Sequence, residues 1–133
     1  MEKLLTMSDL EHNKQTVVAF YTRAFNDKQP ADAVARYVGT EYIQHNPQTA
    51  DGADAFIQAT NALIAEFPEL SVEIKRVIAE ADLVVTHDLI KTAPGDRGLA
   101  GIDIFRLENG KIVEHWDARQ PVPEVTANAN TMF

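Results

Sequence analysis

The spacing of the apolar residues changes once along this chain, and that change limits the possible folds more than any single motif. Up to Phe67 the apolar residues recur three or four positions apart, as in amphipathic helices. From Ser71 onward they alternate with polar residues or form short runs rich in Val, Ile and Leu, as in β-strands. Helices followed by antiparallel strands predict an α+β fold. No repeat or interdomain linker interrupts the pattern, so we expect residues 1–133 to form a single domain.

The first half of the chain predicts three helices. Ser8 and Glu11 have capping-box spacing at the start of the first helix, and Pro30 suits the first position of the second. The predicted helices cover residues 8–25, 30–39 and 53–67. We interpret the intervening segment 41–47 as too short and too polar to form an element of the core.

The second half predicts four strands. They cover residues 72–78, 83–90, 102–107 and 112–120. The dipeptide Asn109-Gly110 is a strong hairpin signal between the last two strands. The polar, proline-interrupted segment 121–133 is expected to be a C-terminal arm, which is mobile or closes a pocket of its own or of a partner subunit.

The composition argues against several classes of function. The chain has 133 residues, of which 45% are hydrophobic, so it can bury one core, and it has no cysteine for disulfides or thiolate chemistry. Its formal net charge of −8 disfavours nucleic acids and anionic membranes as partners, because Lys and Arg provide most of the affinity for polyanions. The chain starts without the apolar core of a signal peptide, and no run reaches transmembrane length, so we expect a cytoplasmic location.

Acidic and histidine side chains interrupt the apolar strands. Asp103 lies between Ile102 and Ile104, where a buried carboxylate is costly unless it is paired or its pKa changes. Desolvation raises such a pKa toward the range that suits a general base. Asp117 is embedded in a similar run, and three histidines complete the group, namely His45, His87 and His115. We expect these polar side chains to converge on an interior cavity.

The length of the last hairpin loop decides which of these residues share a face of the sheet. A two-residue turn at Asn109-Gly110 places Asp103 opposite Trp116, on the face away from Asp117. A three-residue turn that starts at Glu108 places Asp103 opposite His115 instead, with Asp117 diagonally beside them. We favour the second register, because it pairs apolar residues with one another: Phe105 with Val113 and Ile102 with Trp116.

In this register the two faces of the hairpin differ in character. The cavity face carries Asp103, Phe105, Val113, His115 and Asp117. The opposite face carries the apolar residues Ile102, Ile104 and Trp116. A second apolar face suggests a subunit interface, so we expect a homodimer.

Several stretches of the sequence resemble a known family. The most specific are Tyr42 to Pro47 with the following Asp51-Gly52, Asp103 to Arg106, and Gly110 to Asp117. Over nearly its whole length the chain resembles the SnoaL-like polyketide cyclases, a branch of the nuclear-transport-factor-2-like superfamily. The resemblance implies a cone-shaped α+β fold, in which a curved mixed or antiparallel sheet wraps around three N-terminal helices and encloses a pocket.

The resemblance also implies a cofactor-free reaction on a small carbonyl compound, either an aldol cyclisation or an isomerisation. Asp117 would remove a proton α to a carbonyl, and nearby donors would stabilise the enolate oxygen. A protonated Asp103 is one such donor, whereas the characterised cyclases carry a histidine at its position. The candidate catalytic residues are Asp117, Asp103, His87 and His115. The candidate substrate-binding residues are Tyr42, His45, Asn46, Phe105 and Trp116.

Simpler structural interpretations remain open for these residues. Asp117 can merely pair with Arg119 or Lys111, and His115 can serve only to fix Asp103. Tyr42 and Gln44 alternate with Ile43 and His45, so only one of these pairs can point inward in a regular strand.

Two other functions remain open as well. A non-catalytic small-molecule-binding module would use the same fold and the same cavity. A metal-dependent enzyme could use the histidines and carboxylates, but the chain has no HxH or HExxH pair, so we expect no metal and no cofactor.

Overall fold

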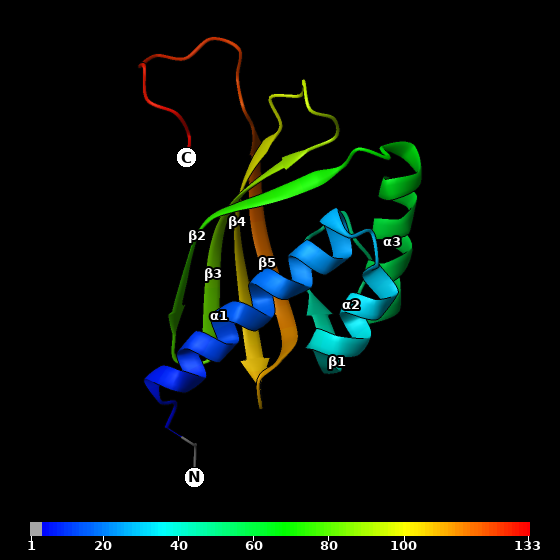
Figure 1. Cartoon of the computed structure of the whole chain (residues 1–133), viewed down its shortest axis with the longest axis vertical. Coiled ribbons are helices and arrows are strands. Elements are labelled where there is room, and N and C mark those ends of the chain that lie inside the picture. The colour runs from blue at the N-terminus through cyan, green and yellow to red at the C-terminus, as the bar shows by residue number, and fades with distance from the viewer. Residues whose placement is uncertain (1–3) are drawn as a thin grey trace.

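The computed structural model describes residues 4–133, which form a helical layer packed on one curved sheet (Figure 1). The elements are α1 (Met7–Tyr21), the π-helical turn η1 (Thr22–Asn26), α2 (Pro30–Tyr37), β1 (Val38–Gln44), α3 (Ala53–Glu66), β2 (Ser71–Glu80), β3 (Leu83–Lys91), β4 (Leu99–Glu108) and β5 (Lys111–Pro121). The three predicted helices and four predicted strands are confirmed, with strand ends that extend one to three residues further. None of the described helices is long and apolar enough to cross a membrane.

The first helix begins earlier than the sequence pattern suggested. Thr6 is its N-cap, and the Thr6 and Asp9 side chains each bind the other's backbone N–H. The prediction of a capping box at Ser8 and Glu11 is therefore wrong. The same spacing of a hydroxyl and an acid occurs two residues upstream, at Thr6 and Asp9, so the helix begins at Met7.

The sheet contains a fifth strand that the sequence analysis missed. The strand order is β1-β5-β4-β3-β2, in which β1 pairs parallel with β5 and all other pairs are antiparallel. The interpretation of segment 41–47 as outside the core is thus wrong, because Tyr42 in β1 is only 3% exposed. An edge strand needs only some of its side chains to be apolar, so its polar residues concealed it.

The last hairpin combines a tight turn with a bulge. Glu108 pairs with Lys111 around a two-residue turn, in which Asn109 and Gly110 both have positive φ, as a type I′ turn requires. The register then shifts, so that Leu107 pairs with Ile112 but Arg106 pairs with Glu114. The bulge at Val113 allows the consecutive residues Ile112 and Val113 both to be buried.

Both registers considered from the sequence are therefore wrong. Asp103 pairs with Asp117, and Ile104 pairs with Trp116. The predicted division into two faces nevertheless holds for Asp103, Phe105, His115 and Asp117, which share the inner face. The observed register differs from the predicted three-residue-turn register by two residues, and an even shift leaves each side chain on the same face.

Helix α1 lies across the inner face of the sheet, and α2 and α3 pack on one another and on β1 at its side (Figure 1). Val17, Phe20 and Tyr21 from α1 are buried in a common core with Phe105 and Ile112 from the sheet. The sheet and helices therefore enclose an interior with polar groups from the strands on one side and aromatic rings from the helices on the other.

The C-terminal segment 122–133 contains no helix or strand, and it leaves the end of β5, loops beyond the sheet and turns back (Figure 1). The Phe133 ring stacks on His87, with 5.4 Å between centroids, and Lys75 Nζ lies 5.3 Å from the Phe133 centroid. This arm consequently ends on the face opposite to Asp103 and Asp117.

Candidate functional site

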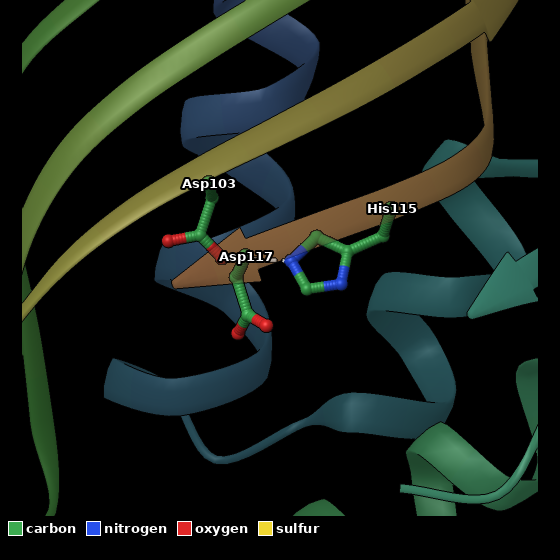
Figure 2. A group of neighbouring side chains, drawn as sticks. All are labelled: Asp103, His115 and Asp117. Carbon is green, nitrogen blue, oxygen red and sulfur yellow. Dashed lines mark hydrogen bonds and ion pairs between the residues drawn. The ribbon is translucent and has the colours of Figure 1, made fainter. Parts of the chain in front are cut away.

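Successive cross-strand rows of the inner face bring the polar residues together. Val84, Phe105 and His115 form one row; Thr86, Asp103 and Asp117 form the next; Asp88, Gly101 and Arg119 form the third. Figure 2 shows Asp103 on β4 directed toward His115 and Asp117 on β5. The strand register therefore creates a compact acidic cluster that contains one arginine and one histidine.

Asp103 is the most contacted carboxylate of the cluster. It is 0% exposed, and its Oδ1 lies 2.7 Å from His115 Nε2 and 3.2 Å from Arg119 Nη2. The Tyr21 hydroxyl donates to the same oxygen. Burial raises the pKa of Asp103, but the hydrogen bonds from His115 and Asp88 and the charge of Arg119 outweigh it, and the net shift is downward. Asp103 is therefore ionised and accepts hydrogen bonds.

The ring orientation of His115 follows from its neighbours. Nδ1 lies 2.8 Å from Gln44 Oε1, and the same oxygen accepts the backbone N–H of Asn46 at 3.0 Å. Since Gln44 Oε1 is an acceptor, Nδ1 carries a hydrogen and donates it. His115 Nε2 faces Asp103, so both ring nitrogens are engaged within the protein. This arrangement agrees with the interpretation of His115 as the residue that fixes Asp103.

Asp117 differs from Asp103 in having one free oxygen. Its side chain is 4% exposed, and its Oδ2 accepts from Arg119 Nε and from Asn46 Nδ2, both at 3.1 Å. Among residues 4–133, no donor hydrogen-bonds to its Oδ1. The carboxylate is thus held in place through one oxygen while the other can accept a proton.

Asp88 and Arg119 complete the cluster across a glycine. Arg119 Nη1 lies 3.2 Å from Asp88 Oδ1, with Gly101 between them in the row. A Cβ on Gly101 would lie 2.6 Å from Asp88 Oδ1 and 2.7 Å from Arg119 Nη1, so only glycine permits this contact. Arg119 therefore bonds to three carboxylates, those of Asp88, Asp103 and Asp117.

The raised pKa of Asp88 favours a proton on this carboxyl. Burial, a hydrogen bond to Asp103 and the charge of Asp103 raise the pKa of Asp88. No described residue forms a hydrogen bond to Asp103 Oδ2, and the interaction with Asp103 that raises the pKa of Asp88 favours a proton on Asp88. The lowered pKa of Asp103 disfavours the protonated, donating form that the resemblance implied. Asp103 receives three donors, whereas Asp88 receives two.

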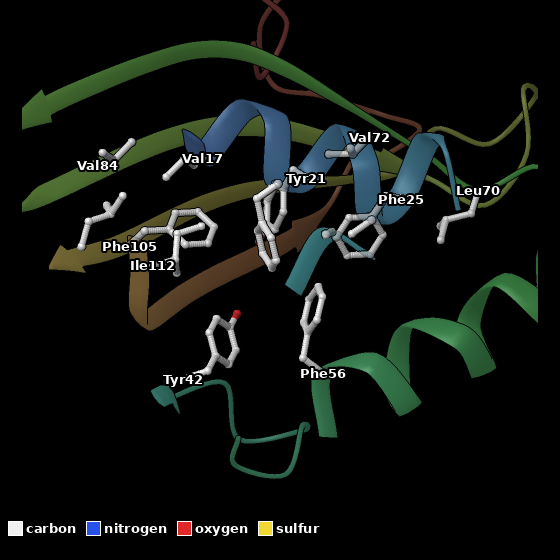
Figure 3. Packing of buried hydrophobic residues seen from close by; sticks show 14 residues of the cluster. Val17, Tyr21, Phe25, Tyr42, Phe56, Leu70, Val72, Val84, Phe105 and Ile112 are labelled. Atoms are coloured by element: carbon white, nitrogen blue, oxygen red, sulfur yellow. The ribbon is translucent and has the colours of Figure 1, made fainter. Parts of the chain in front are cut away.

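Aromatic rings surround the cluster and keep its dielectric low. Figure 3 shows Tyr21, Phe105, Tyr42 and Phe56 facing the interior between sheet and helices. Phe105 lies 5.2 Å from Tyr21 and 4.9 Å from His115, measured between ring centroids. Charged groups interact strongly in such surroundings, so the hydrogen bonds within the cluster fix its geometry.

Three alternate side chains of segment 42–46, those of Tyr42, Gln44 and Asn46, point toward the interior. Tyr42 packs inside, Gln44 bonds to His115, and Asn46 bonds to Asp117. The side-chain oxygen of Asn46 also accepts a hydrogen bond from the Gln48 backbone N–H at 2.8 Å. Asn46 therefore stabilises the local turn as well as holding Asp117. Of the two alternating pairs in this strand, Tyr42 and Gln44 are the ones that point inward.

Three candidate residues lie on the outer face, away from the cluster. His87 contacts the Arg76 guanidinium and the Phe133 ring. His45 stacks on Trp116, with 4.8 Å between centroids and 3° between planes, and its Nε2 lies 2.7 Å from Glu114 Oε2. The structure does not bring His87, His45 or Trp116 to Asp103 and Asp117.

Two members of the cluster, Tyr21 and Asp88, were not predicted from the sequence, Gln44 was considered only for its direction, and Arg119 was named only as a possible partner of Asp117, a pairing that the structure confirms. A signal existed for Arg119, which follows Asp117 by two residues on one strand and so shares its face. No comparable signal existed for Tyr21, whose position in the aromatic stripe of α1 predicts only a core role. Asp88 and His87 are neighbours in an apolar strand, and the sequence pattern did not decide which of them points inward.

The cluster fits a metal ion poorly. Ligand atoms of Asp103, His115 and Asp117 lie within 4.8 Å of one another, a spacing that a metal could use. Arg119, however, donates to both carboxylates, and its guanidinium already provides the positive charge that a metal would bring. A metal would have to displace that side chain.

A hollow of about 280 Å³ lies on the outer face. It is lined by residues of both kinds: the outer-face and arm residues His87, Ile102, Ala118, Gln120 and Met132, and Gly101 and Arg119 from the third row of the cluster. A second hollow of about 370 Å³ lies beside the loop that joins β3 and β4. Neither Asp103 nor Asp117 lines these hollows.

Comparisons with known proteins agree with this architecture. A protein-family model described as SnoaL-like polyketide cyclase matches residues 15–124. A search of curated proteins finds no match.

Solved structures similar to this chain include a candidate polyketide cyclase of Bacillus cereus, at 18% identity and a TM-score of 0.73, covering 86% of this chain and 78% of that one. A candidate SnoaL-like cyclase of Jannaschia has 19% identity and a TM-score of 0.69, covering 88% and 91%. AclR of Streptomyces galilaeus, described as a candidate hydroxylase, has 16% identity and a TM-score of 0.66, covering 84% and 90%. At these identities the similarity shows the shared cone-like fold alone.

Proposed function

Because this chain belongs to the SnoaL-like polyketide cyclase family, we propose that it removes a proton α to a carbonyl group of a small compound without a cofactor. The resulting enolate then closes a ring by aldol addition or takes the proton back at another position, as in an isomerisation. The observation that carries this proposal is the asymmetry of Asp117, whose Oδ2 is held by Arg119 and Asn46 while no described residue donates to Oδ1.

Asp117 Oδ1 acts as the general base. It takes the proton from the α carbon, and the electron pair of the C–H bond moves into the enolate, so negative charge passes from Asp117 to the enolate oxygen. Arg119 stays beside this charge throughout, and the Asn46 amide has a second hydrogen to donate. In the aldol route the enolate carbon attacks a second carbonyl, and the neutral Asp117 returns its proton to the new alkoxide.

The other members of the cluster position this base. His115 and Tyr21 hold Asp103, and Asp103 and Asp88 hold Arg119 against Asp117. A preorganised set of this kind needs no reorganisation when charge moves during the reaction. In this proposal the outer-face residues His87, His45 and Trp116 take no part in the chemistry.

Deuterium uptake at the α carbon of β-dicarbonyl compounds, measured by proton NMR, tests the proposal. We expect the protein to accelerate uptake for at least one member of a panel and to keep its rate in the presence of a chelator. Loss of the rate on chelation would instead assign the chemistry to a metal.

A non-catalytic binding module is the second candidate function. It is favoured by one observation: most polar atoms of the cluster are already bonded to other protein groups, as a structural network would be. Binding of panel members without accelerated uptake would support this alternative.

We also propose a homodimer formed through the outer face of the sheet. Ile78, Leu83 and Ile102 project from that face and are 60%, 38% and 46% exposed. Burial of these side chains against a second copy would remove apolar surface from water. The C-terminal arm crosses the same face, so it would lie at the edge of the interface or within it.

A further inference from the structure

We propose that the Tyr42 hydroxyl donates the hydrogen bond that holds the carbonyl oxygen of the substrate and stabilises it as the enolate forms. This inference rests on the proposed function and adds a catalytic residue to it. It also narrows the substrate to an uncharged carbonyl compound, because a carboxylate at this position would face Asp103 and Asp117.

The Tyr42 hydroxyl is a buried polar group with an unused hydrogen. The residue is 3% exposed, and no described group has hydrogen-bonding geometry to its hydroxyl, although the adjacent Gln44 side chain is near enough to act on its pKa. The neighbouring Gln44 oxygen already accepts from His115 and Asn46. Buried polar groups almost always have a partner, and leaving one without costs stability, so the exception needs an explanation. A ligand that supplies the missing acceptor provides one.

The position of the ring is fixed by its surroundings. Its ring centroid lies 6.4 Å from that of Phe20, 5.7 Å from that of Phe56 and 6.2 Å from that of His115, and its plane is 12° from that of His115. Figure 3 shows Tyr42 and Phe56 on the same side of the core. Strand β1 also pairs in parallel with β5, where Gln44 aligns with His115. A donor held on both sides in this way does not have to reorganise during the reaction.

Tyr42 on β1 and Asp117 on β5 belong to the inner side of the sheet, and the charge of Asp117 contributes to raising the pKa of Tyr42. Tyr42, Gln44 and Asn46 all point inward; Gln44 bonds to His115, and Asn46 bonds to Asp117. On β5, His115 and Asp117 share the inner face. In this proposal the carbonyl compound lies on the inner face of β1 and β5, with its oxygen at Tyr42 and its α hydrogen at Asp117.

Local charges keep the hydroxyl protonated. Burial first, and then the charges of Asp103 and Asp117, raise the pKa of Tyr42. The phenol thus donates a hydrogen bond without giving up its proton. In the reaction the proton moves from carbon to Asp117 alone, and the enolate oxygen accepts a stronger hydrogen bond from Tyr42 until it becomes a carbonyl again.

The other two tyrosines do not have a buried hydroxyl that lacks an acceptor. The Tyr21 hydroxyl is engaged by Asp103 and His115. Tyr37 on α2 is half-buried outside the cluster, which makes it a matched control for removal of a phenol oxygen.

The test compares wild type, Tyr42→Phe and Tyr37→Phe in acetylacetone deuterium exchange and in urea unfolding. We expect Tyr42→Phe to lower the exchange kcat/KM by about tenfold or more, with an unfolding midpoint equal to or above that of wild type, and Tyr37→Phe to keep the rate. Exchange at the wild-type rate in Tyr42→Phe would overturn the inference and leave the role of Asp117 intact. A lower unfolding midpoint in Tyr42→Phe would also overturn it, because the hydroxyl would then be bonded within the fold.

If wild type does not exchange acetylacetone, the proposed function fails, and calorimetric titration of the same compound decides the inference. A dissociation constant that is about fivefold or more weaker in Tyr42→Phe would support Tyr42 as the donor to the ligand. Equal affinity in the two proteins, or no binding by wild type, would overturn it.

Discussion

Asp103 stands directly opposite Asp117 across the β4–β5 ladder. Like charges in directly opposite positions destabilise a sheet, so the pair requires compensation. Arg119 donates to both carboxylates and, in addition, to Asp88 in the neighbouring row. The stability of the inner face and the placement of the proposed base therefore depend on the same guanidinium.

Replacement of Arg119 by Met should be strongly destabilising. It leaves three buried carboxyl groups without their cation, and breaking a buried ion pair in this way costs about 3–5 kcal/mol. Arg106→Met on the same hairpin is the matched control. Arg106 pairs with Glu114 and the exposed Glu108, so its loss should cost at most about 1 kcal/mol. Urea unfolding measures both values, and equal losses would contradict the proposed importance of Arg119.

The proton on Asp88 predicts a pH-dependent stability. Burial and Asp103 raise the pKa of Asp88 to about 8 in the folded protein, whereas an unfolded aspartate titrates near ~3.9. Between these values the folded state holds one more proton than the unfolded state. This carboxyl therefore contributes stability at acidic pH, which is lost as pH rises through that window by up to about 1.4 kcal/mol per pH unit.

Asp88→Asn removes this titration while it keeps a neutral hydrogen-bonding group. The difference in unfolding free energy between wild type and Asp88→Asn should fall steadily from pH 5 toward pH 8, because only wild type loses stability by this route. Urea unfolding at several pH values measures the difference. A difference that does not change with pH would mean that Asp88 is ionised in the folded protein.

Gly101→Ala tests the crowding between strands β3 and β5. The new methyl group would lie 2.6 Å from Asp88 Oδ1 and 2.7 Å from Arg119 Nη1, so the ion pair must separate. Overpacking of this kind costs about 1–3 kcal/mol. Gly95→Ala is the control, since nothing lies within 4 Å of its added Cβ, and it should be neutral or slightly stabilising. Thermal unfolding of the two variants separates these outcomes.

The proposed dimer predicts a concentration-dependent change in mass. Ile102→Lys places a charge on the outer face, where Ile102 is 46% exposed, and should shift the protein to monomer in sedimentation experiments. Met7→Lys on α1, also at an exposed position, should leave the oligomeric state unchanged. A wild-type protein that sediments as a monomer at all concentrations would contradict the dimer.

Most of the fold could be predicted from the sequence, because its elements have strong local signals. The helices follow apolar periodicity, and the Asn109-Gly110 turn formed as its residues require. The bulge at Val113 has no local signal, because it results from the burial of both Ile112 and Val113 in the assembled core. Strand β1 was missed for a similar reason: its polar residues are accommodated by pairing with β5, which is far away in sequence.

The candidate site was predictable only in part. Asp103, His115 and Asp117 were identified because charged residues in apolar strands are unusual, and the structure brings them together. Tyr21 and Asp88 joined the cluster through tertiary packing and strand register, which the sequence does not specify. His87 was chosen by residue type alone, and alternation along β3 places it on the outer face.

The most direct test of the account is the initial rate of deuterium uptake by acetylacetone in the presence of Asp117→Asn. Asparagine can still accept the hydrogen bonds from Arg119 and Asn46, so the variant should fold, but it cannot take a proton. Asp54→Asn, which changes an exposed acid at the start of α3, controls for the loss of one negative charge. We predict that Asp117→Asn lowers the enzyme-dependent rate by about 100-fold or more, while Asp54→Asn retains the wild-type rate. Uptake at the wild-type rate in Asp117→Asn would show that Asp117 is not the base.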